Sequence, residues 1–313
     1  MPTTSTIQSA ASLIRESQTA GLLLDSPGLT GYSGTHLMGT LQRLARLHAD
    51  KDQCYLEVGV FQGLTLLSVA NAIRDRGQAY GIDNFAFFDP ENKNFDLVKA
   101  RGEQLGLSNA HLINRDYEDA LHSLPEHIGD RKIGVYFVDG PHDYRSQLVC
   151  LLFALPYLAD DAIIVIDDCN YRHVRQANAD FLRSHPEFKL LFEVYTPAHP
   201  DNMTDRQLEA ARNGWWDGVN ILVRDPNNEL PQNFPPTHRH RGLYENEHKI
   251  HSSRFPEAAL LGVRLAEEYA RKNLAKVATV NRKLAGLSSG ETPDFAHTNT
   301  YSEQLTGFSL YAE

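Results

Sequence analysis

This sequence is poor in cysteine, in long apolar runs and in clustered positive charge. Its three cysteines are Cys54, Cys150 and Cys169, and their spacing fits neither a disulfide framework nor a zinc site. The longest apolar run, LVCLLFAL, is far too short to span a bilayer. The N-terminal residues MPTTSTIQSAASLIRESQ lack the basic segment and apolar core of a signal peptide. These absences predict a cytoplasmic protein without a membrane partner.

Clustered basic residues are confined to HRHR at 238–241 and RKNLAK at 271–276. The formal net charge of the chain is -10. An acidic surface does not favour phosphate contacts, so we expect no nucleic-acid partner. The composition, 42% hydrophobic and 22% charged over 313 residues, suits one large α/β domain or two small ones.

Strands and helices alternate along the middle of the chain. Apolar runs such as QCYLEVGV, IGVYFVDG and AIIVIDD are typical of strands that are buried on both faces, and helical segments separate them. This alternation predicts an α/β fold with a Rossmann-like, seven-stranded, mostly parallel sheet and helices on both faces. In such sheets, ligands bind at the carboxyl ends of the strands.

Three segments are expected on this basis. Residues 1–50 carry a leucine stripe at helical spacing and predict an N-terminal helical cap. Residues 51–226 hold the predicted sheet, and residues 227–313 form a C-terminal helical extension and tail. A helix is expected to begin at Pro256. After Gly286 the sequence becomes rich in Ser, Gly and Thr. This extension could serve a homo-oligomer or fold over a site.

Two of the apolar runs lead directly into carboxylates. Asp139 ends one of them, and Asp167 and Asp168 end the next. Buried charges need a partner, because desolvating them is costly. Neighbouring strands lie about 4.8 Å apart, so we expect the three carboxylates to meet at one edge of the sheet. A divalent cation at that edge would relieve their repulsion.

A glycine-containing turn follows the first strand. Glu57, Gly59 and Gly63 stand in the order E-x-G-x-x-x-G, and glycine lets the backbone approach a ligand at the start of a helix. Phe61 and Leu64 interrupt the G-x-G-x-x-G pattern of dinucleotide-binding proteins, which counts against an NAD enzyme. Glu57 could reach the ammonium group of a ligand, or it could be the satisfied partner of a nearby loop.

Further candidates for the same ligand lie at other strand ends and in the N-terminal linker. Asp83 ends the second strand, where an acid typically binds two ribose hydroxyls; a cap of a helix or turn is the alternative. Asp116 ends the third strand and could form a wall of a base pocket or simply serve the turn. Tyr32 and Ser33 could close over this ligand.

Together, these motifs resemble class I S-adenosylmethionine-dependent methyltransferases. Within that superfamily, the chain is similar to the metal-dependent O-methyltransferases that act on deoxysugars of macrolides, and more distantly to the catechol O-methyltransferases. The resemblance covers roughly residues 53–225. It rests on the glycine turn, on Asp83, on FVDGPHDY and on IVIDDCN.

The resemblance implies a cofactor and a metal ion. It implies that S-adenosylmethionine binds at Glu57, Gly59, Gly63 and Asp83. It also implies that Mg²⁺ binds to Asp139, Asp167 and Asp168, and that His142 is the general base. From the residues alone, His142 could equally form hydrogen bonds within its own loop.

The predicted function is therefore metal-dependent O-methyl transfer. Mg²⁺ prefers oxygen ligands and can orient two adjacent hydroxyls, so a natural-product sugar or a vicinal diol is the expected acceptor. One alternative is an NAD-linked oxidoreductase on a Rossmann sheet. Another is a non-catalytic module that binds a nucleotide.

Overall fold

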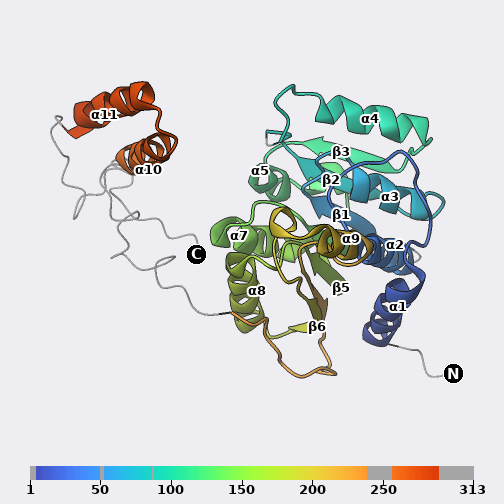
Figure 1. Cartoon of the computed structure of the whole chain (residues 1–313). Helices are drawn as coiled ribbons and strands as arrows, with labels where there is room; N and C mark the ends of the chain where they lie inside the picture. The colour runs from blue at the N-terminus through green and yellow to red at the C-terminus, as the bar shows by residue number, and fades with distance from the viewer. Residues whose placement is uncertain (1–4, 50–52, 87, 238–255, 289–313) are drawn as a thin grey trace, which may run out of the picture. The chain divides into compact units, whose positions relative to one another are not determined.

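The computed structural model describes residues 5–49, 53–86, 88–237 and 256–288 (Figure 1). The chain forms two compact units, Met1–Arg239 and His240–Glu313. The predicted Ser- and Thr-rich tail lies mostly in residues 289–313, and the HRHR cluster lies in residues 238–241, so both fall outside the described residues.

A seven-stranded sheet forms the centre of the first unit. Its strands are β1 (Cys54–Val58), β2 (Ala79–Asp83), β3 (Ala110–Asn114), β4 (Ile133–Val138), β5 (Leu158–Ile166), β6 (Phe188–Val194) and β7 (Val219–Arg224). They lie in the order β3-β2-β1-β4-β5-β7-β6. The pairs from β3 to β5 are parallel, whereas β7 runs antiparallel to both β5 and β6. The predicted Rossmann-like, mostly parallel sheet is confirmed.

Helices connect and cover the strands. In the first unit they are α1 (Thr6–Ala20), α2 (Thr35–Ala49), α3 (Leu64–Ala72), α4 (Asn94–Gln104), α5 (Tyr117–His122), α6 (Pro125–Ile128), α7 (Tyr144–Ala154), α8 (Arg172–Ser184) and α9 (Asp205–Asn213), with short 3₁₀ helices η1 (Leu155–Tyr157) and η2 (Pro200–Asn202). Figure 1 shows α7 and α8 on one side of the sheet and α1 to α3 on the other.

Both faces of the sheet are buried because successive side chains of a strand point in opposite directions. In β4, Val135 and Phe137 join the core beneath α1, α2 and α3, whereas Tyr136 and Val138 join the core beneath α5, α7 and α8. All four side chains are at most 1% exposed. This double burial explains why the strand sequences are apolar throughout rather than alternating.

The N-terminal helices pack directly on the sheet. Leu37, Leu41 and Leu44 of α2 are fully buried in the same core as β1 and β4, as the leucine stripe predicts. The chain between α1 and α2 is fixed by Gln42, whose side chain accepts a hydrogen bond from Leu23 N (2.8 Å) and donates one to Leu24 O (2.7 Å). This linker leads towards the glycine turn.

The second unit contains two helices that pack on each other, α10 (Pro256–Ala270) and α11 (Leu274–Ser288). Its exposed apolar side chains include Val263, Tyr269 and Leu274.

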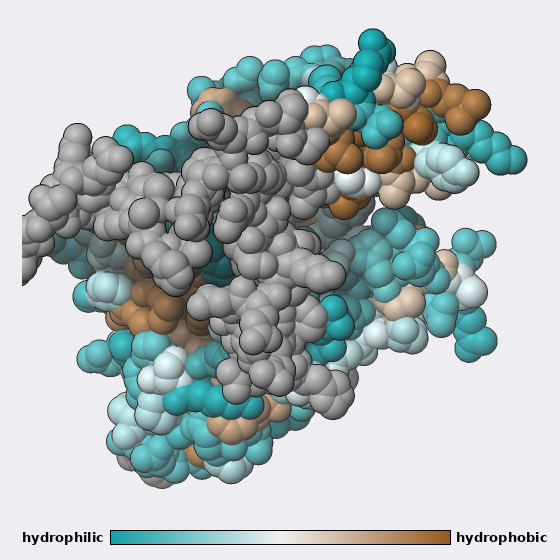
Figure 2. Space-filling model, turned by 90° about the vertical axis from the view of Figure 1, so that its left-hand side faces the viewer, coloured by the Kyte–Doolittle hydropathy of each residue, from teal (hydrophilic) through white to brown (hydrophobic). Residues whose placement is uncertain are grey.

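On the side of the molecule drawn in Figure 2, apolar areas are interspersed among hydrophilic residues. None of the helices in the described part of the chain combines the length and apolarity needed to cross a bilayer.

Candidate active site

The register of the sheet places the predicted site residues side by side. Val58, Val138 and Ile166 are the last residues of three adjacent parallel strands, and they are aligned with one another. The alignment continues one residue further, since Asp139 N donates to Val58 O (2.9 Å) and Asp167 N donates to Val138 O (3.0 Å). The glycine turn and both carboxylate segments therefore meet at one carboxyl edge, as the strand pattern predicts.

The two glycines of the turn are required by its shape. Gly59 has φ +94°, and a Cβ atom there would lie 1.8 Å from the carbonyl oxygen of Asp139. Gly63 has φ +82° and directly precedes α3. Only glycine adopts such a backbone readily. The turn is thus held close to the Asp139 segment, with the N-terminus of α3 behind it.

Asp83 organises this turn from the end of β2. Its Oδ2 accepts hydrogen bonds from Val60 N (2.9 Å) and Phe61 N (2.8 Å), and its Oδ1 accepts one from Phe85 N (2.7 Å). Phe61 has φ +49°, a strained conformation for a bulky residue. The carboxylate therefore holds the strained turn in place. It also lies where an acid of a Rossmann-type sheet would bind a ribose.

Glu57 lies below the turn and is fully buried. It accepts hydrogen bonds from Tyr55 Oη (2.6 Å) and Thr65 Oγ1 (3.2 Å). Burial raises the pKa of Glu57 to about 8, although both hydrogen bonds oppose this shift. Of the two interpretations of Glu57, this geometry favours the internal partner over direct ligand contact.

The N-terminal linker covers the turn. The ring of Tyr32 stacks on Phe61, with centroids 5.4 Å apart, and on Trp216, with centroids 5.9 Å apart. Tyr32 is nevertheless 63% exposed. The Oγ of the neighbouring Ser33 is buried without a hydrogen-bond partner among the described residues. The role of both residues in covering a ligand on the turn stays a prediction.

Asp116 takes a local structural role. It is the N-cap of α5, and its side chain accepts a hydrogen bond from Glu118 N (2.9 Å). This is the turn role that the sequence left open beside the base-pocket role. The pocket role stays a prediction.

Next to the glycine turn lies an acidic cluster, which consists of Asp139, Asp167, Asp168 and Asp217. The side chain of Asp168 interacts with those of both Asp139 and Asp217. Burial raises the pKa of Asp168 to about 6. Burial raises the pKa of Asp217 to about 7, and the charge of Asp168 contributes to that shift. Burial thus favours the protonated forms of these carboxyls.

The metal site is not preassembled in this conformation. Across residues 5–49, 53–86, 88–237 and 256–288, no three His, Cys, Asp or Glu side chains form a group that could hold an ion. Asp167 instead turns its Oδ1 towards Asp168 N, at 2.9 Å. The donor chemistry still fits a hard cation, because the cluster is rich in oxygen. In addition, Asp217 Oδ2 is buried and lacks a hydrogen-bond partner within the described part of the chain.

His142 contacts this cluster from the loop after β4. Its Nε2 lies 3.2 Å from Asp168 Oδ2, and its ring stacks on Tyr171 with centroids 5.0 Å apart. Burial lowers the pKa of His142 below its usual value. A neutral imidazole that donates from Nε2 to Asp168 keeps Nδ1 as its basic nitrogen. The predicted base is therefore placed beside the acids.

Several residues of this edge were missed by reasoning from the sequence. Asp217 precedes β7, and Asn170 holds it by donating from Nδ2 to Asp217 Oδ1 (2.7 Å). The same Nδ2 donates to Thr196 Oγ1 (2.6 Å), and Asn170 Oδ1 accepts a hydrogen bond from Thr196 N (3.1 Å). His199 follows in the same segment. The Trp-Trp-Asp-Gly sequence before β7 was the available signal for Asp217, since polar residues near a strand end can reach a ligand.

Residues 56–169 match the family model described as a methyltransferase domain. The matched segment begins in β1 and ends at Cys169, so it contains the glycine turn, Asp83 and the predicted metal-binding aspartates. The match covers about a third of the chain, and over this segment it agrees with the predicted class, an S-adenosylmethionine-dependent methyltransferase of class I. It favours this class over the NAD-linked alternative.

Solved structures of methyltransferases are similar to the chain. An O-methyltransferase from Bacillus cereus in complex with SAH has 14% identity and a TM-score of 0.47, over 72% of this chain and 93% of that one. TomG from Streptomyces achromogenes, an O-methyltransferase involved in tomaymycin synthesis, has 18% identity and a TM-score of 0.46, over 71% and 90%. The Podospora anserina methyltransferase PaMTH1 has 15% identity and a TM-score of 0.43, over 70% and 87%. No curated protein matches the sequence significantly.

Proposed function

We propose that the protein transfers a methyl group from S-adenosylmethionine to a hydroxyl of a small polyhydroxylated acceptor. One observation carries this proposal: a buried acidic cluster with an adjacent imidazole borders the glycine turn of a methyltransferase domain. The turn and the acidic cluster are in direct contact, because Gly59 approaches the Asp139 carbonyl too closely for any side chain. A sulfonium bound on the turn and an acceptor bound at the acids would thus be neighbours.

The cofactor would be held by the turn and its surroundings. The backbone at Gly59 and Gly63 is open to a ligand, and the positive end of α3 follows it. Asp83 is the candidate that binds the ribose hydroxyls. Hydrogen bonds from these hydroxyls would replace its bonds to the turn. Tyr32 and Ser33 would cover the bound molecule. Alignment of the two reactants can lower the barrier by about 7–11 kcal/mol.

A hard divalent cation, Mg²⁺ being the simplest choice, fits the acidic cluster. Asp139, Asp167 and Asp168 are the proposed ligands, and Asp217 supplies a further buried oxygen. When bound, the ion would stabilise the negative charge on the acceptor oxygen. Binding would require these side chains to reorient, because within the described part of the chain they do not form a group that could hold an ion. The excess of buried carboxylates provides the driving force for such a change.

His142 is the proposed general base. Its Nδ1 would take the proton of the acceptor hydroxyl, while Asp168 holds the ring through Nε2. The lowered pKa keeps the imidazole neutral and able to accept a proton near neutral pH. The stacked Tyr171 ring restricts the orientation of the imidazole.

Mass spectrometry of products tests this proposal. The protein is incubated with S-(methyl-¹³C)-adenosylmethionine, Mg²⁺ and a panel of vicinal diols, including sugars and catechols. We expect a labelled O-methyl product that disappears with Asp168→Asn and persists with Asp119→Asn, an exposed change on α5. Binding of S-adenosylmethionine should survive Asp168→Asn within a few-fold. Unchanged turnover in Asp168→Asn would remove the proposed role of the cluster.

A further inference from the structure

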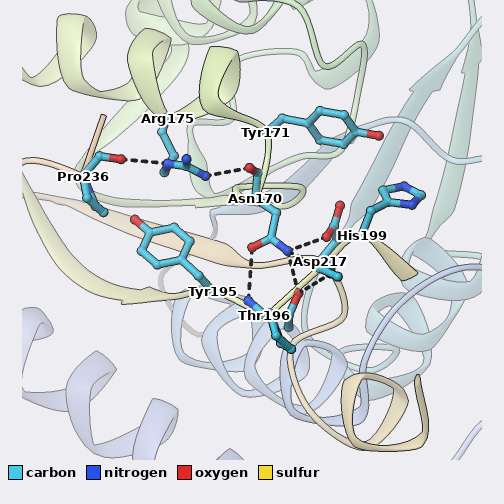
Figure 3. A pocket seen from close by; sticks show the side chains of 10 residues that line it. Asn170, Tyr171, Arg175, Tyr195, Thr196, His199, Asp217 and Pro236 are labelled. Atoms are coloured by element: carbon cyan, nitrogen blue, oxygen red, sulfur yellow. Dashed lines mark hydrogen bonds between the residues drawn. The ribbon is translucent and has the colours of Figure 1, made fainter. Parts of the chain in front are cut away.

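A pocket of about 410 Å³ lies beside the acidic cluster (Figure 3). It is formed by the segment that leads into α8, by the segment after β6, by Asp217 and by Pro236. Its volume falls within the range of about 300–1,000 Å³ that is usual for small-molecule sites. Pockets at the carboxyl edge of an α/β sheet are the usual location of ligands.

The pocket and the acidic cluster share a wall. Asp217 lines the pocket and also contacts Asp168. Figure 3 shows Tyr171, His199 and Asp217 towards one end, and Arg175, Tyr195 and Pro236 towards the other. A molecule in this pocket would therefore have one end at the acids and the remainder between the two tyrosines.

The lining selects against an anion and suits a hydroxylated ring. Acids at one end repel negative charge. Arg175 at the other end is already engaged, because it donates to the carbonyl oxygens of Cys169 (2.6 Å), Asn170 (2.7 Å) and Pro236 (2.8 Å). The Tyr171 ring stacks on His142, and Arg175 lies over the Tyr195 ring, 5.3 Å from its centroid. Both tyrosines line the pocket, where their remaining ring surface can pack against a ring.

His199 is placed as a hydrogen-bond donor in this pocket. Its Nδ1 accepts a hydrogen bond from Asp201 N (3.2 Å), which leaves the hydrogen of the neutral ring on Nε2. Its ring meets Tyr171 edge-on, with centroids 5.9 Å apart, and His142 stacks on the same tyrosine. The two histidines are thus complementary: His142 retains a basic nitrogen and His199 retains a donor.

We propose that this pocket binds the methyl acceptor, and that His199 Nε2–H donates a hydrogen bond to the hydroxyl next to the one that is methylated. The ligand class is a ring with two adjacent hydroxyls and no negative charge. This inference rests on the proposed function, since it assigns the acceptor subsite of that reaction. His199 is a positioning residue that orients the acceptor.

A purely local role for His199 makes a different prediction. His199 is also the N-cap of η2 through the same bond to Asp201 N. Asparagine is a good capping residue, so His199→Asn retains the cap but removes the Nε2 donor. His199→Ala removes both. Comparing the two variants therefore separates support of the loop from contact with the acceptor.

The test is calorimetric titration of the full chain loaded with S-adenosylhomocysteine and Mg²⁺. One arm uses catechol and the other uses methyl α-L-rhamnopyranoside, so that aryl and sugar rings are distinguished. Phenol is the matched probe with a single hydroxyl. His122→Ala, at the exposed end of α5, is the control variant.

We expect at least one arm to bind the wild type and the His122→Ala control equally. His199→Ala and His199→Asn should both weaken that diol about tenfold, leave phenol unchanged and leave S-adenosylhomocysteine within twofold. Equal diol affinity in wild type and His199→Asn would overturn the role of His199. Binding of S-adenosylhomocysteine without binding of either diol would overturn the ligand class alone. Failure of S-adenosylhomocysteine itself to bind would instead refute the proposed function.

Discussion

Replacement of Glu57 by glutamine should change how stability depends on pH. Glu57 is fully buried at the end of β1, and its oxygens accept hydrogen bonds from Tyr55 and Thr65. Burial raises the pKa of this carboxyl from 4.5 to about 8. The folded protein therefore holds the proton of Glu57 at a pH where the unfolded chain has released it. Glutamine has the same shape and no charge.

The magnitude follows from the shift. One pKa unit corresponds to about 1.4 kcal/mol, so the full shift is worth roughly 5 kcal/mol. The contribution of Glu57 is fully present below about pH 4.5, and it is lost as the pH rises towards about 8. Between pH 5 and pH 7, the free energy of unfolding of the wild type should fall by about 2–3 kcal/mol relative to Glu57→Gln.

Urea denaturation followed by circular dichroism at several pH values measures this difference. Glu118→Gln is the control, because Glu118 is partly exposed and forms an ion pair with Arg145 that lowers its pKa. The difference in free energy of unfolding between the wild type and Glu118→Gln should not fall as the pH rises. If the difference between wild type and Glu57→Gln is constant from pH 5 to pH 8, the carboxyl ionises normally and the buried network is described incorrectly.

Other substitutions test the turn, the pocket and the core. Gly59→Ala places a Cβ against the Asp139 carbonyl, so binding of S-adenosylmethionine should become undetectable by calorimetry; near-normal affinity would show that the turn is not where the cofactor binds. Asn170→Ala frees Asp217, and should lower the turnover of the diol at least tenfold while cofactor affinity stays within twofold; loss of both would mean a general structural role. Phe181→Ala leaves a cavity beneath α8 and should lower the free energy of unfolding by about 3–5 kcal/mol; a loss under 1 kcal/mol would contradict its full burial.

The parallel part of the fold could be predicted from the sequence because burial imposes a simple pattern. β1, β4 and β5 are covered on both faces, so their residues are apolar throughout and their ends are marked by polar residues. Their adjacency brings Asp139 and Asp167 together, as expected. The turn glycines were predictable for a similar reason, since their backbone conformations exclude other residues.

The remaining site residues could not be predicted because they lie next to the antiparallel part of the sheet. β7 inserts between β5 and β6, and it runs against β5, so Asn220 pairs with Ile166. The start of β7, and with it Asp217, therefore lies at the carboxyl edge. The Trp-Trp-Asp-Gly sequence before β7 places a polar residue near a strand end, but no periodicity reveals that β7 inserts between β5 and β6. His199 reaches the same edge because β6 ends beside the start of β7, where Val194 pairs with Val219.

The metal geometry also could not be read from spacing. Adjacent strand ends predict that carboxylates gather, and they do gather. The side-chain orientations depend on backbone details, such as φ +54° at Asp168 and the bond from Asp168 N to Asp167 Oδ1. A left-handed conformation at an aspartate leaves no signature in a single sequence. The sequence therefore located the acids without fixing their coordination.

Calorimetric titration of S-adenosylmethionine into the purified chain tests the central claim most directly. The account predicts saturable binding at one site per chain, unaffected by an excess of NADH. Absence of binding up to millimolar S-adenosylmethionine, or its displacement by NADH, would contradict the assignment of the glycine turn as a sulfonium site.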